Sequence, residues 1–572
     1  MNKQEKTIAI LLGLCLAGWL WYSVTEQKKA AEAARESMAA QAAAQQTRPA
    51  LAGSEAQAAA AAKPPAQTEK ETVRAACLKP ETLVALSNAQ EKVVLSTHGA
   101  SVKSVTLLGY ARDRGEVSEK NPPVVLDFAS APALAAEGDF EIAGRGDDFV
   151  LFRNASMTRR IRLSGDYRLE IEEESASRLP DRLPVGVMSM GGGANDLLSV
   201  DSWVVDANGG RVVHHGEEEP LESYLVASTG GCSGKKSAAG IPETSEVSVP
   251  GACKWIAVKN RFFVTAVCAM SEPATGFKAF MKRDMNASDY VLKDVSAAVG
   301  MSGDAKSRKY TFYAGPKKQS LLWDLGMRDV MEFGMWRWVC YPLVWILNVF
   351  HSWIPSFGVG IILLTVLVRL VFWPLTHKST VSMRRMSEIQ PKMKEIREKF
   401  KDNPQRLQQE TWALYRDNKV NPMASCLPML VQIPVFIALF TVLRSAVELR
   451  YAPFLWIADL SEPENLLPGI FPFGGLNILP ILMAVTMGLQ SALTPSTGDK
   501  QQQRMMMIMM PVMMLVMFYS FPSALSLYWT LSQVLSIVQM WYIRKRYTPP
   551  APAAATDTVE AVVTRQMRRH GN

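Results

Sequence analysis

The sequence predicts a polytopic α-helical membrane protein that carries one large all-β domain outside its hydrophobic core. Three observations lead to this prediction. Of the 572 residues, 48% are hydrophobic and 20% are charged, and the apolar residues are concentrated in blocks. Short alternating strands separated by turn residues fill the region between the first block and the later ones. The loops between the later blocks alternate between basic and acidic, as in multispanning membrane proteins.

The apolar blocks predict six transmembrane helices, because the last block is too long for one span and is divided at Pro522. The first block, Ile8 to Val24, ends in bulky aromatic residues and lacks a small-x-small cleavage site. We therefore favour an uncleaved anchor over the alternative, a cleaved signal peptide. The predicted spans are an anchor at 1–26 and helices at 356–376, 426–446, 474–494, 505–520 and 522–543.

Charge in the short loops predicts the orientation. The segment His377–Asn421 carries eleven Lys/Arg against six Asp/Glu, whereas 447–473 has one arginine and four acidic residues. The basic loops, including 495–504, are therefore placed in the cytoplasm, together with both termini. Lys28 and Lys29 argue against this orientation, because they would lie outside the cytoplasm just after the first span. A large domain, however, translocates largely regardless of its flanking charge. The formal charge of +8 then reflects topology and contact with anionic lipid rather than nucleic-acid binding.

Composition divides the rest of the chain into further segments. Residues 27–79 are rich in Ala and Gln and predict a periplasmic linker, partly helical or disordered. Residues 80–330 predict a periplasmic β-sandwich, with strands such as Lys92–Leu108 and turns such as Gly165-Asp166. The remaining predictions are an interfacial amphipathic helix at 331–355, preferred over an additional span, a cytoplasmic helical hairpin at 377–421, and a cytoplasmic tail at 544–572.

The predicted hairpin has apolar residues at three- and four-residue steps and a break at Asp402-Asn403-Pro404. Its narrow apolar stripe either pairs the two arms with each other or accepts another amphipathic segment.

Motifs of enzyme chemistry are missing from the sequence. There is no HExxH, GxSxG or paired CxxC, and the stretch Gly230–Ser237 is one residue short of a phosphate loop, with Lys236 in place of the Ser or Thr that would bind Mg²⁺. We predict no enzyme activity, no cofactor and no metal site. A disulfide between Cys232 and Cys253, which flank a Gly/Ser/Pro-rich loop, stays an open possibility.

Arg369 lies inside an apolar run, where a guanidinium costs on the order of 3 kcal/mol. This residue either faces a polar cavity or snorkels to the headgroups. Thr365 lies four residues earlier on the same helical face, and Gln432 lies between two prolines of the next span. The last span carries a polar stripe, Ser526, Thr530 and Gln533. Each of these alone makes an interhelical hydrogen bond worth ~0.6 kcal/mol. Together with Arg369 they favour a shared hydrated pocket.

The fifth span is unusual in composition, with eight methionines between Met505 and Met517. At helical rise it covers only about 24 Å, which would thin the bilayer beside it. Methionine is flexible and suits surfaces that accept varied apolar partners, although ordinary lipid-facing packing explains it equally well.

Taken together, several stretches resemble the YidC-type membrane protein insertases of Gram-negative bacteria. The similarity covers about residues 340 to 546 and is carried by Thr365–His377, Gln390–Phe400, Val420–Thr441, Val447–Ser461 and Phe521–Trp529. The resemblance implies a five-helix core around a hydrophilic groove that is open to the cytoplasm and lipid and closed outward. It also implies that the β domain is a β-supersandwich, a fold similar to sugar mutarotases but not known for catalysis.

The resemblance assigns site residues as well. Arg369 matches the family's essential intramembrane arginine and Thr365 its groove threonine. The positions predicted to contact client proteins are Pro428, Ile433, Phe436, Met517, Phe518, Tyr528 and Trp529. At the last two positions the family frequently has two tyrosines, so the indole at 529 is a departure. The tail is short and has three arginines near its end, Arg565, Arg568 and Arg569, unlike the long basic tail that helps members of the family bind ribosomes.

The expected function is therefore that of an insertase and chaperone in the bacterial inner membrane. Its expected partners are nascent membrane proteins, the Sec translocon with its accessory subunits, and the ribosome or signal recognition machinery through the hairpin. Two rivals are a secondary transporter or channel for an anionic solute, and an envelope scaffold whose sandwich binds glycans. The sequence shows neither the internal repeats nor the additional spans that are usual in transporters.

Overall fold

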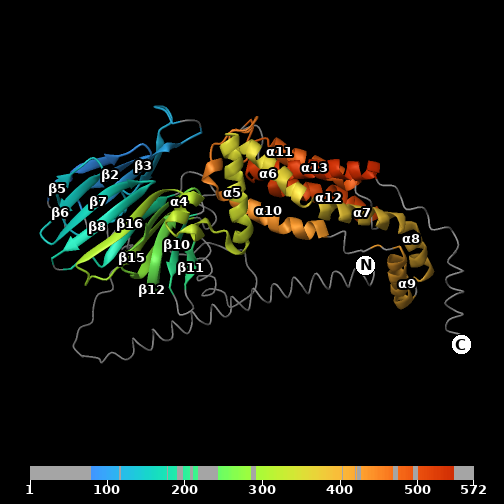
Figure 1. Cartoon of the computed structure of the whole chain (residues 1–572), viewed down its shortest axis with the longest axis horizontal. Helices are drawn as coiled ribbons and strands as arrows, with labels where there is room; N and C mark the ends of the chain where they lie inside the picture. The colour runs from blue at the N-terminus through green and yellow to red at the C-terminus, as the bar shows by residue number, and fades with distance from the viewer. Residues whose placement is uncertain are drawn as a thin grey trace, which may run out of the picture. The chain divides into compact units, whose positions relative to one another are not determined.

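The computed structural model describes residues 79–114, 117–176, 178–189, 198–205, 210–216, 243–284, 292–401, 403–418, 420, 427–467, 475–493 and 500–546. The predicted anchor, the linker up to residue 78, Cys232 and the tail from residue 547 lie outside these residues. The chain forms two compact units. One contains the segment His377–Leu427, and the other contains the strands and most of the helices (Figure 1).

The strands form two antiparallel sheets among the described residues (Figure 1). A four-stranded sheet has the order β1-β2-β3-β4. A twelve-stranded sheet follows the path β5-β6-β7-β8-β16-β13-β12-β14-β15-β9, with β10 bonded to β12 and β11 bonded to β10. The strands are β1 Leu83–Ser87, β2 Glu91–Ser96, β3 Ser101–Ala111, β4 Pro123–Asp127, β5 Glu141–Arg145, β6 Phe149–Arg153, β7 Met157–Gly165, β8 Arg168–Ser175, β9 Arg182–Ser189, β10 Ser199–Val204, β11 Arg211–His215, β12 Thr244–Lys259, β13 Phe263–Cys268, β14 Ala274–Arg283, β15 Leu292–Gly300 and β16 Ser307–Pro316.

The alternating sequence explains these strands. In β7, residues 157, 159, 161 and 163 are buried, and their neighbours are exposed or half-buried. The turn predicted at Gly165-Asp166 joins β7 to β8, with both residues at positive φ. The prediction of mostly β structure in this region is therefore confirmed. The run Lys92–Leu108 is two strands rather than one, because Gly99 (φ 68°) and Ala100 (φ 46°) reverse the chain between β2 and β3.

The two sheets share one hydrophobic core. Phe128, which follows β4, packs edge to face against Phe312 of β16, with ring centroids 6.3 Å apart. Strand β9 also contacts β12 and β13, with which it shares no ladder, because the large sheet folds over on itself. The core therefore lies between layers of strands, as a sandwich requires.

Helices make up the second half of the chain. They are α4 Gln319–Asp324, α5 Arg337–Trp353, α6 Phe357–Val371, α7 Trp373–Glu388, α8 Gln390–Lys399, α9 Pro404–Asp417, α10 Leu427–Ser445, α11 Ile478–Leu493, α12 Lys500–Phe518 and α13 Ser523–Arg546, with short 3-10 turns η1 Arg328–Met331, η2 Gly334–Trp336 and η4 Val447–Leu449. The division predicted at Pro522 separates α12 from α13. Within the described residues, no single helix passes a test of length and hydropathy for crossing a membrane, whereas α6 and α7 pass it together as a pair bent by 62°.

The bend lies within the predicted span at 356–376. Helix α6 ends at Val371 and α7 begins at Trp373. Pro374 is the cause, because it has no N–H to continue the helical hydrogen bonds of α6.

In the other unit, α8 and α9 form the predicted hairpin. Asn403 caps α9 by accepting a hydrogen bond from the backbone N of Arg406 at 3.1 Å, and Pro404 occupies the first turn. Tyr415 donates to the Sδ of Met393 at 3.2 Å. Met386, Ile389 and Val420 form the small core, with Leu414 and Tyr415 against it. The apolar stripe therefore pairs the arms of the hairpin with each other.

Candidate functional site

Arg369 lies in the last turn of α6 and contacts α13. Its Nε donates a hydrogen bond to the Oγ of Ser532 at 3.0 Å, and its Nη2 donates to the same oxygen. The arginine side chain is half-buried and Ser532 is buried. Within the described part of the chain, no carboxylate forms an ion pair with Arg369. The structure therefore fixes the position of this positive charge without neutralising it.

Ser532 belongs to a polar stripe along one face of α13, at residues 528, 532, 536 and 539. The Nε2 of Gln432 in α10 donates to the hydroxyl of Tyr528 at 2.7 Å. At the other end, the Nε2 of Gln539 donates to the Oγ1 of Thr376 in α7 at 2.9 Å. The stripe thus joins α13 to α10, α6 and α7.

The stripe predicted from the sequence, Ser526, Thr530 and Gln533, lies on a different face. Thr530 is buried, and its hydroxyl donates to the carbonyl of Ser526 at 2.7 Å. The carbonyl oxygen of Leu479 in α11 lies 3.5 Å from the same hydroxyl. Ser526 is also buried, and its hydroxyl has no hydrogen-bond partner among the residues that the structure describes. Gln533 is half-buried, and in the described residues no hydrogen bond joins it to Arg369 or Gln432. Sequence reasoning thus missed Ser532, Gln539 and Thr376, although residues 528, 532, 536 and 539 recur with the same helical spacing.

Thr365 is fully buried one turn before Arg369. Its hydroxyl donates to the carbonyl of Ile361 in its own helix at 2.6 Å. The structure therefore satisfies this threonine locally rather than by a contact to Arg369.

The predicted client contacts come together from α10, α12 and α13. The ring of Trp529 lies edge to face on Phe436, with centroids 4.9 Å apart, and 5.4 Å from the ring of Phe518. The indole Nε1 of Trp529 is buried, and no described residue forms a hydrogen bond with it. Two of the predicted contacts, Ile433 and Met517, are about two-fifths exposed (41% and 42%).

Two other predicted contacts are placed differently. Phe518 and Tyr528 are fully buried, at 0% and 1% exposure, so neither touches a client unless the helices move. The side chain of Pro428 lies outside the described residues.

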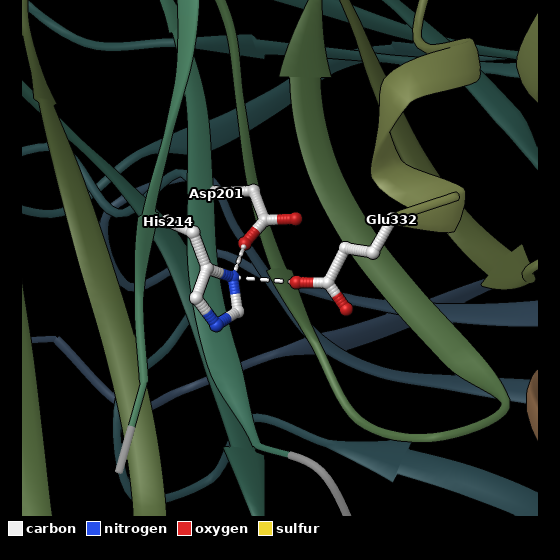
Figure 2. Close-up of side chains that lie close together, drawn as sticks. All are labelled: Asp201, His214 and Glu332. Atoms are coloured by element: carbon white, nitrogen blue, oxygen red, sulfur yellow. Dashed lines mark hydrogen bonds and ion pairs between the residues drawn. The ribbon is translucent and has the colours of Figure 1, made fainter. Parts of the chain in front are cut away.

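A second cluster of charged groups lies in the β domain (Figure 2). The Nδ1 of His214 in β11 lies 2.7 Å from Asp201 Oδ1 in β10 and 2.5 Å from Glu332 Oε1, just after η1. These three ligand-type atoms converge as the ligands of a metal would. Their positions in the sequence span more than a hundred residues, so no spacing motif could have revealed them.

Lys259 completes the cluster with a cation of the protein itself. Its buried ammonium pairs with Asp201 and, at 3.0 Å, with Glu332. Burial lowers the pKa of His214, but hydrogen bonds to Asp201 and Glu332 outweigh burial and raise this pKa to about 10. Among the described residues, His214 and Lys259 thus each pair with the carboxylates of Asp201 and Glu332. The cluster is an ionic network that joins β10, β11 and β12 to the segment before α5.

Comparison with known proteins places the chain in a family. The model described as 60Kd inner membrane protein matches residues 349–550, and the model described as YidC periplasmic domain matches residues 222–346. A membrane protein insertase YidC from Chloroherpeton thalassium is 31% identical over 485 residues, which is 79% of this chain and 80% of that protein. The protein of that name from Syntrophobacter fumaroxidans is 44% identical over 299 residues, 51% of this chain and 53% of its own length.

Similarities to solved structures are weaker. A crystal structure of an active YidC insertase with its first transmembrane domain resolved is 17% identical, with 81% of this chain and 93% of that chain covered and a TM-score of 0.34. A galactose mutarotase-like protein from Lactobacillus casei is 10% identical over 41% of this chain and all of that one, with a TM-score of 0.24. Scores this low do not establish a shared fold, so the assignment rests on sequence. Because the relative from Chloroherpeton thalassium is 31% identical over 80% of its length, the chain belongs to the YidC family of membrane protein insertases.

Proposed function

We propose that this insertase moves short hydrophilic segments of nascent membrane proteins into a groove lined by α6, α10 and α13, and that Arg369 attracts acidic residues of the client. The proposal rests on the surroundings of the Arg369 guanidinium. The hydroxyl of Ser532 holds it in place, and no carboxylate of the described residues pairs with it. A charge in that state gains more from a client carboxylate than a neutralised charge would.

The client's own hydrophobic segment supplies the free energy. Removing apolar surface from water yields about 25 cal/mol per Å², and a helical segment satisfies its backbone hydrogen bonds in lipid. The polar groups of Gln432, Tyr528 and Ser532 shorten the apolar path that the client's hydrophilic end has to cross. The family is one of insertases rather than enzymes, and we assign no catalytic residue.

The proposed setting is the one expected from the sequence. The chain would span the inner membrane six times, with both termini cytoplasmic and the β domain periplasmic, and its segments would follow the boundaries given above. It would work alone or with the Sec translocon, and its basic hairpin would meet the ribosome or signal recognition machinery. Ile433, Phe436, Met517 and Trp529 would contact the client first.

Insertion in depleted cells tests the proposal. The substrates are a matched pair of clients that differ only in the translocated tail, acidic in one and with the corresponding amides in the other. Arg369→Ala is expected to slow insertion of the acidic-tailed client on the order of tenfold, with little effect on the amide version, whereas Arg369→Lys should keep much of the rate. Normal insertion of the acidic client by Arg369→Ala would show that the charge mechanism is wrong.

The same assay separates the rivals. Deleting residues 80 to 310 should leave most insertion intact if the helical core is the insertase, whereas an envelope scaffold would lose its function. An anion transporter would show solute-dependent flux that disappears with Arg369 and would not insert clients.

A further inference from the structure

The tight turn between β12 and β13, residues Lys259–Phe262, projects charged side chains toward the helices; we call it the anchor turn. Asn260 shapes this turn, because its Oδ1 accepts hydrogen bonds from the backbone N of Phe262 at 3.0 Å and of Phe263 at 2.7 Å. Its own backbone N donates to the carbonyl of Phe263 at 3.0 Å. The β domain therefore fixes the conformation of the turn, whatever the turn contacts.

Arg261 is the residue of the anchor turn that reaches the helical core. Its Nε donates to the carbonyl of Arg444 at 2.8 Å, and its Nη2 donates to the carbonyl of Ser461 at 2.6 Å. Its Nη1 pairs with the carboxylate of Glu462, and only 4% of the arginine side chain is exposed. Arg444 lies in the last turn of α10, where carbonyls lack helical partners and a cation is favoured. Arg261 therefore caps the end of α10.

The segment that Arg261 contacts also ties down the start of α13. The carbonyl of Glu462 accepts hydrogen bonds from the backbone N and the Oγ of Ser523, at 2.9 and 2.6 Å. The carbonyl of Leu460 accepts from the N of Ala524 at 3.0 Å. The end of α10 and the start of α13 are thus joined through residues 460–462, and Arg261 lies at the junction.

Aromatic rings lie between this junction and the polar groups of the groove. The ring centroids are 5.4 Å apart for Phe440 and Phe521, 5.1 Å for Phe521 and Phe518, and 6.1 Å for Phe518 and Phe436. Further along the same two helices come the hydrogen bond between Gln432 and Tyr528 and then Ser532 with Arg369. The order along α10 and α13 is therefore an ionic junction, an aromatic layer and a polar groove.

A second arginine strengthens the attachment from the opposite direction. Arg450, just after η4, lies over the ring of Phe263 with its guanidinium carbon 5.4 Å from the centroid, and its Nη1 donates to the carbonyl of Ala111 at 2.8 Å. The β domain and the loop after α10 thus each contribute one arginine to their shared contact.

We propose that Arg261 is a positioning residue that keeps the groove closed at the end facing the β domain. By holding the end of α10 and the start of α13 at residues 460–462, it keeps the aromatic layer shut, so that water and client enter only from the opposite end. This inference rests on the proposed function, because it concerns the direction in which that groove opens.

Sided labelling of the full chain in vesicles tests the inference. The reporter is Gln432→Cys, a half-buried groove position of α10, and the probe is a membrane-impermeant maleimide added either to the side of the β domain or to the opposite side. Peptide mass spectrometry reads the reporter site alone, so the seven native cysteines stay in place. In the parent chain we expect labelling from the opposite side only.

With Arg261→Ala, labelling from the side of the β domain is expected to rise about tenfold or more, because local opening becomes easier. The matched control is Lys278→Ala, which breaks an exposed ion pair with Glu246 in the same domain and should leave the labelling unchanged. Parent-like protection in Arg261→Ala, or an equal rise in Lys278→Ala, would overturn the inference.

Two milder variants keep the test decisive if Arg261→Ala does not accumulate in the membrane. Arg261→Lys retains the charge but loses the forked geometry, and Glu462→Gln retains the shape but loses the charge. Both should give intermediate labelling, and parent-like protection in both would overturn the inference. Failure of the proposed function has a different signature: the reporter in the parent chain would then be protected from both sides, irrespective of residue 261.

Discussion

Arg369 of α6 directs two of its guanidinium nitrogens, Nε and Nη2, to the single hydroxyl of Ser532 in α13. The contact crosses between two helices that are far apart in the sequence and holds the arginine side chain in one orientation. A hydroxyl is a neutral acceptor, so the positive charge stays available to an acidic partner. Ser532 thus sets the position of the guanidinium and Arg369 supplies the charge, so the two contributions can be tested separately.

Replacing Ser532 with alanine removes the acceptor and leaves the charge. Because a hydrogen bond contributes about 1 kcal/mol net, we expect insertion of an acidic-tailed client to slow about fivefold, less than in Arg369→Ala. Ser536→Ala is the matched control, since within the described part of the chain that hydroxyl donates to the carbonyl of Ser532 in its own helix, at 3.0 Å, and to no other helix. Equal rates for Ser532→Ala and the parent chain would show that the contact does not orient Arg369.

The hydrogen bond from Gln432 to Tyr528 joins α10 to α13 at 2.7 Å. A double-mutant cycle with Gln432→Leu and Tyr528→Phe should give a coupling of about 0.6 kcal/mol in the stability of the helical core, as for other hydrogen bonds between membrane helices. The measurement is thermal unfolding of the full chain in detergent. Strictly additive effects of the two substitutions would mean that the hydrogen bond does not stabilise this pair of helices.

Glu173 of β8 is the centre of a buried ionic network in the β domain. It accepts hydrogen bonds from Arg159 Nε at 2.8 Å and from the hydroxyl of Tyr310 at 2.7 Å, and it pairs with Arg308. Glu173→Gln leaves two buried cations without a carboxylate, so we expect the β domain to lose about 3–5 kcal/mol of stability.

Circular dichroism of the full chain during thermal unfolding measures this loss. The control is Asp148→Asn, which breaks an exposed pair with Arg162 and should cost about 0.5 kcal/mol or less. Similar losses for both substitutions would contradict the role assigned to Glu173.

His214 makes the stability of the β domain dependent on pH. Burial opposes its charge, but hydrogen bonds to Asp201 and Glu332 raise its pKa to about 10, above the value of about 6.5 in an unfolded chain. Its contribution is therefore fully present below pH 6.5 and is lost as the pH rises toward 10. Because 51% of the side chain is exposed, solvent screening limits the contribution to about 1 kcal/mol.

The measurement compares the unfolding midpoints of the parent chain and His214→Gln at pH 6, 8 and 10. The parent chain should be the more stable at pH 6, and the difference should shrink as the pH rises. A difference that stays constant across this range would show that the histidine charge does not stabilise the domain.

Local sequence patterns predicted the helices and strands better than they predicted the contacts between them. The β7–β8 hairpin follows from alternation and from the glycine at its turn, and the start of α9 follows from Asn403-Pro404. The bend near Phe372 was missed although Pro374 signals it, because the apolar run continues on both sides of the break. Elements that depend on neighbours in sequence were therefore largely predictable.

The site was harder to predict for a physical reason. On α13, residues 526, 530 and 533 and residues 528, 532, 536 and 539 fit helical spacing equally well, and only the packing of α6 and α10 decides which face meets Arg369. In the same way, the resemblance named Phe518 and Tyr528 as contact residues, but neighbouring side chains bury both. The pairing of Glu173 with Arg308 joins strands 135 residues apart, a separation that no local pattern encodes.

The position of β16 in the large sheet has a consequence for how this chain is made. This strand lies between β8 and β13, yet of the described strands it is the last to be synthesised. The sheet therefore keeps two unpaired edges until residue 316 has left the ribosome, and pairing over such long separations is slow. The groups that receive the anchor turn, at Arg444 and Ser461, emerge later still. During biogenesis the β domain thus cannot close before residue 316 has emerged, and its contacts through the anchor turn cannot form before residue 461 has followed.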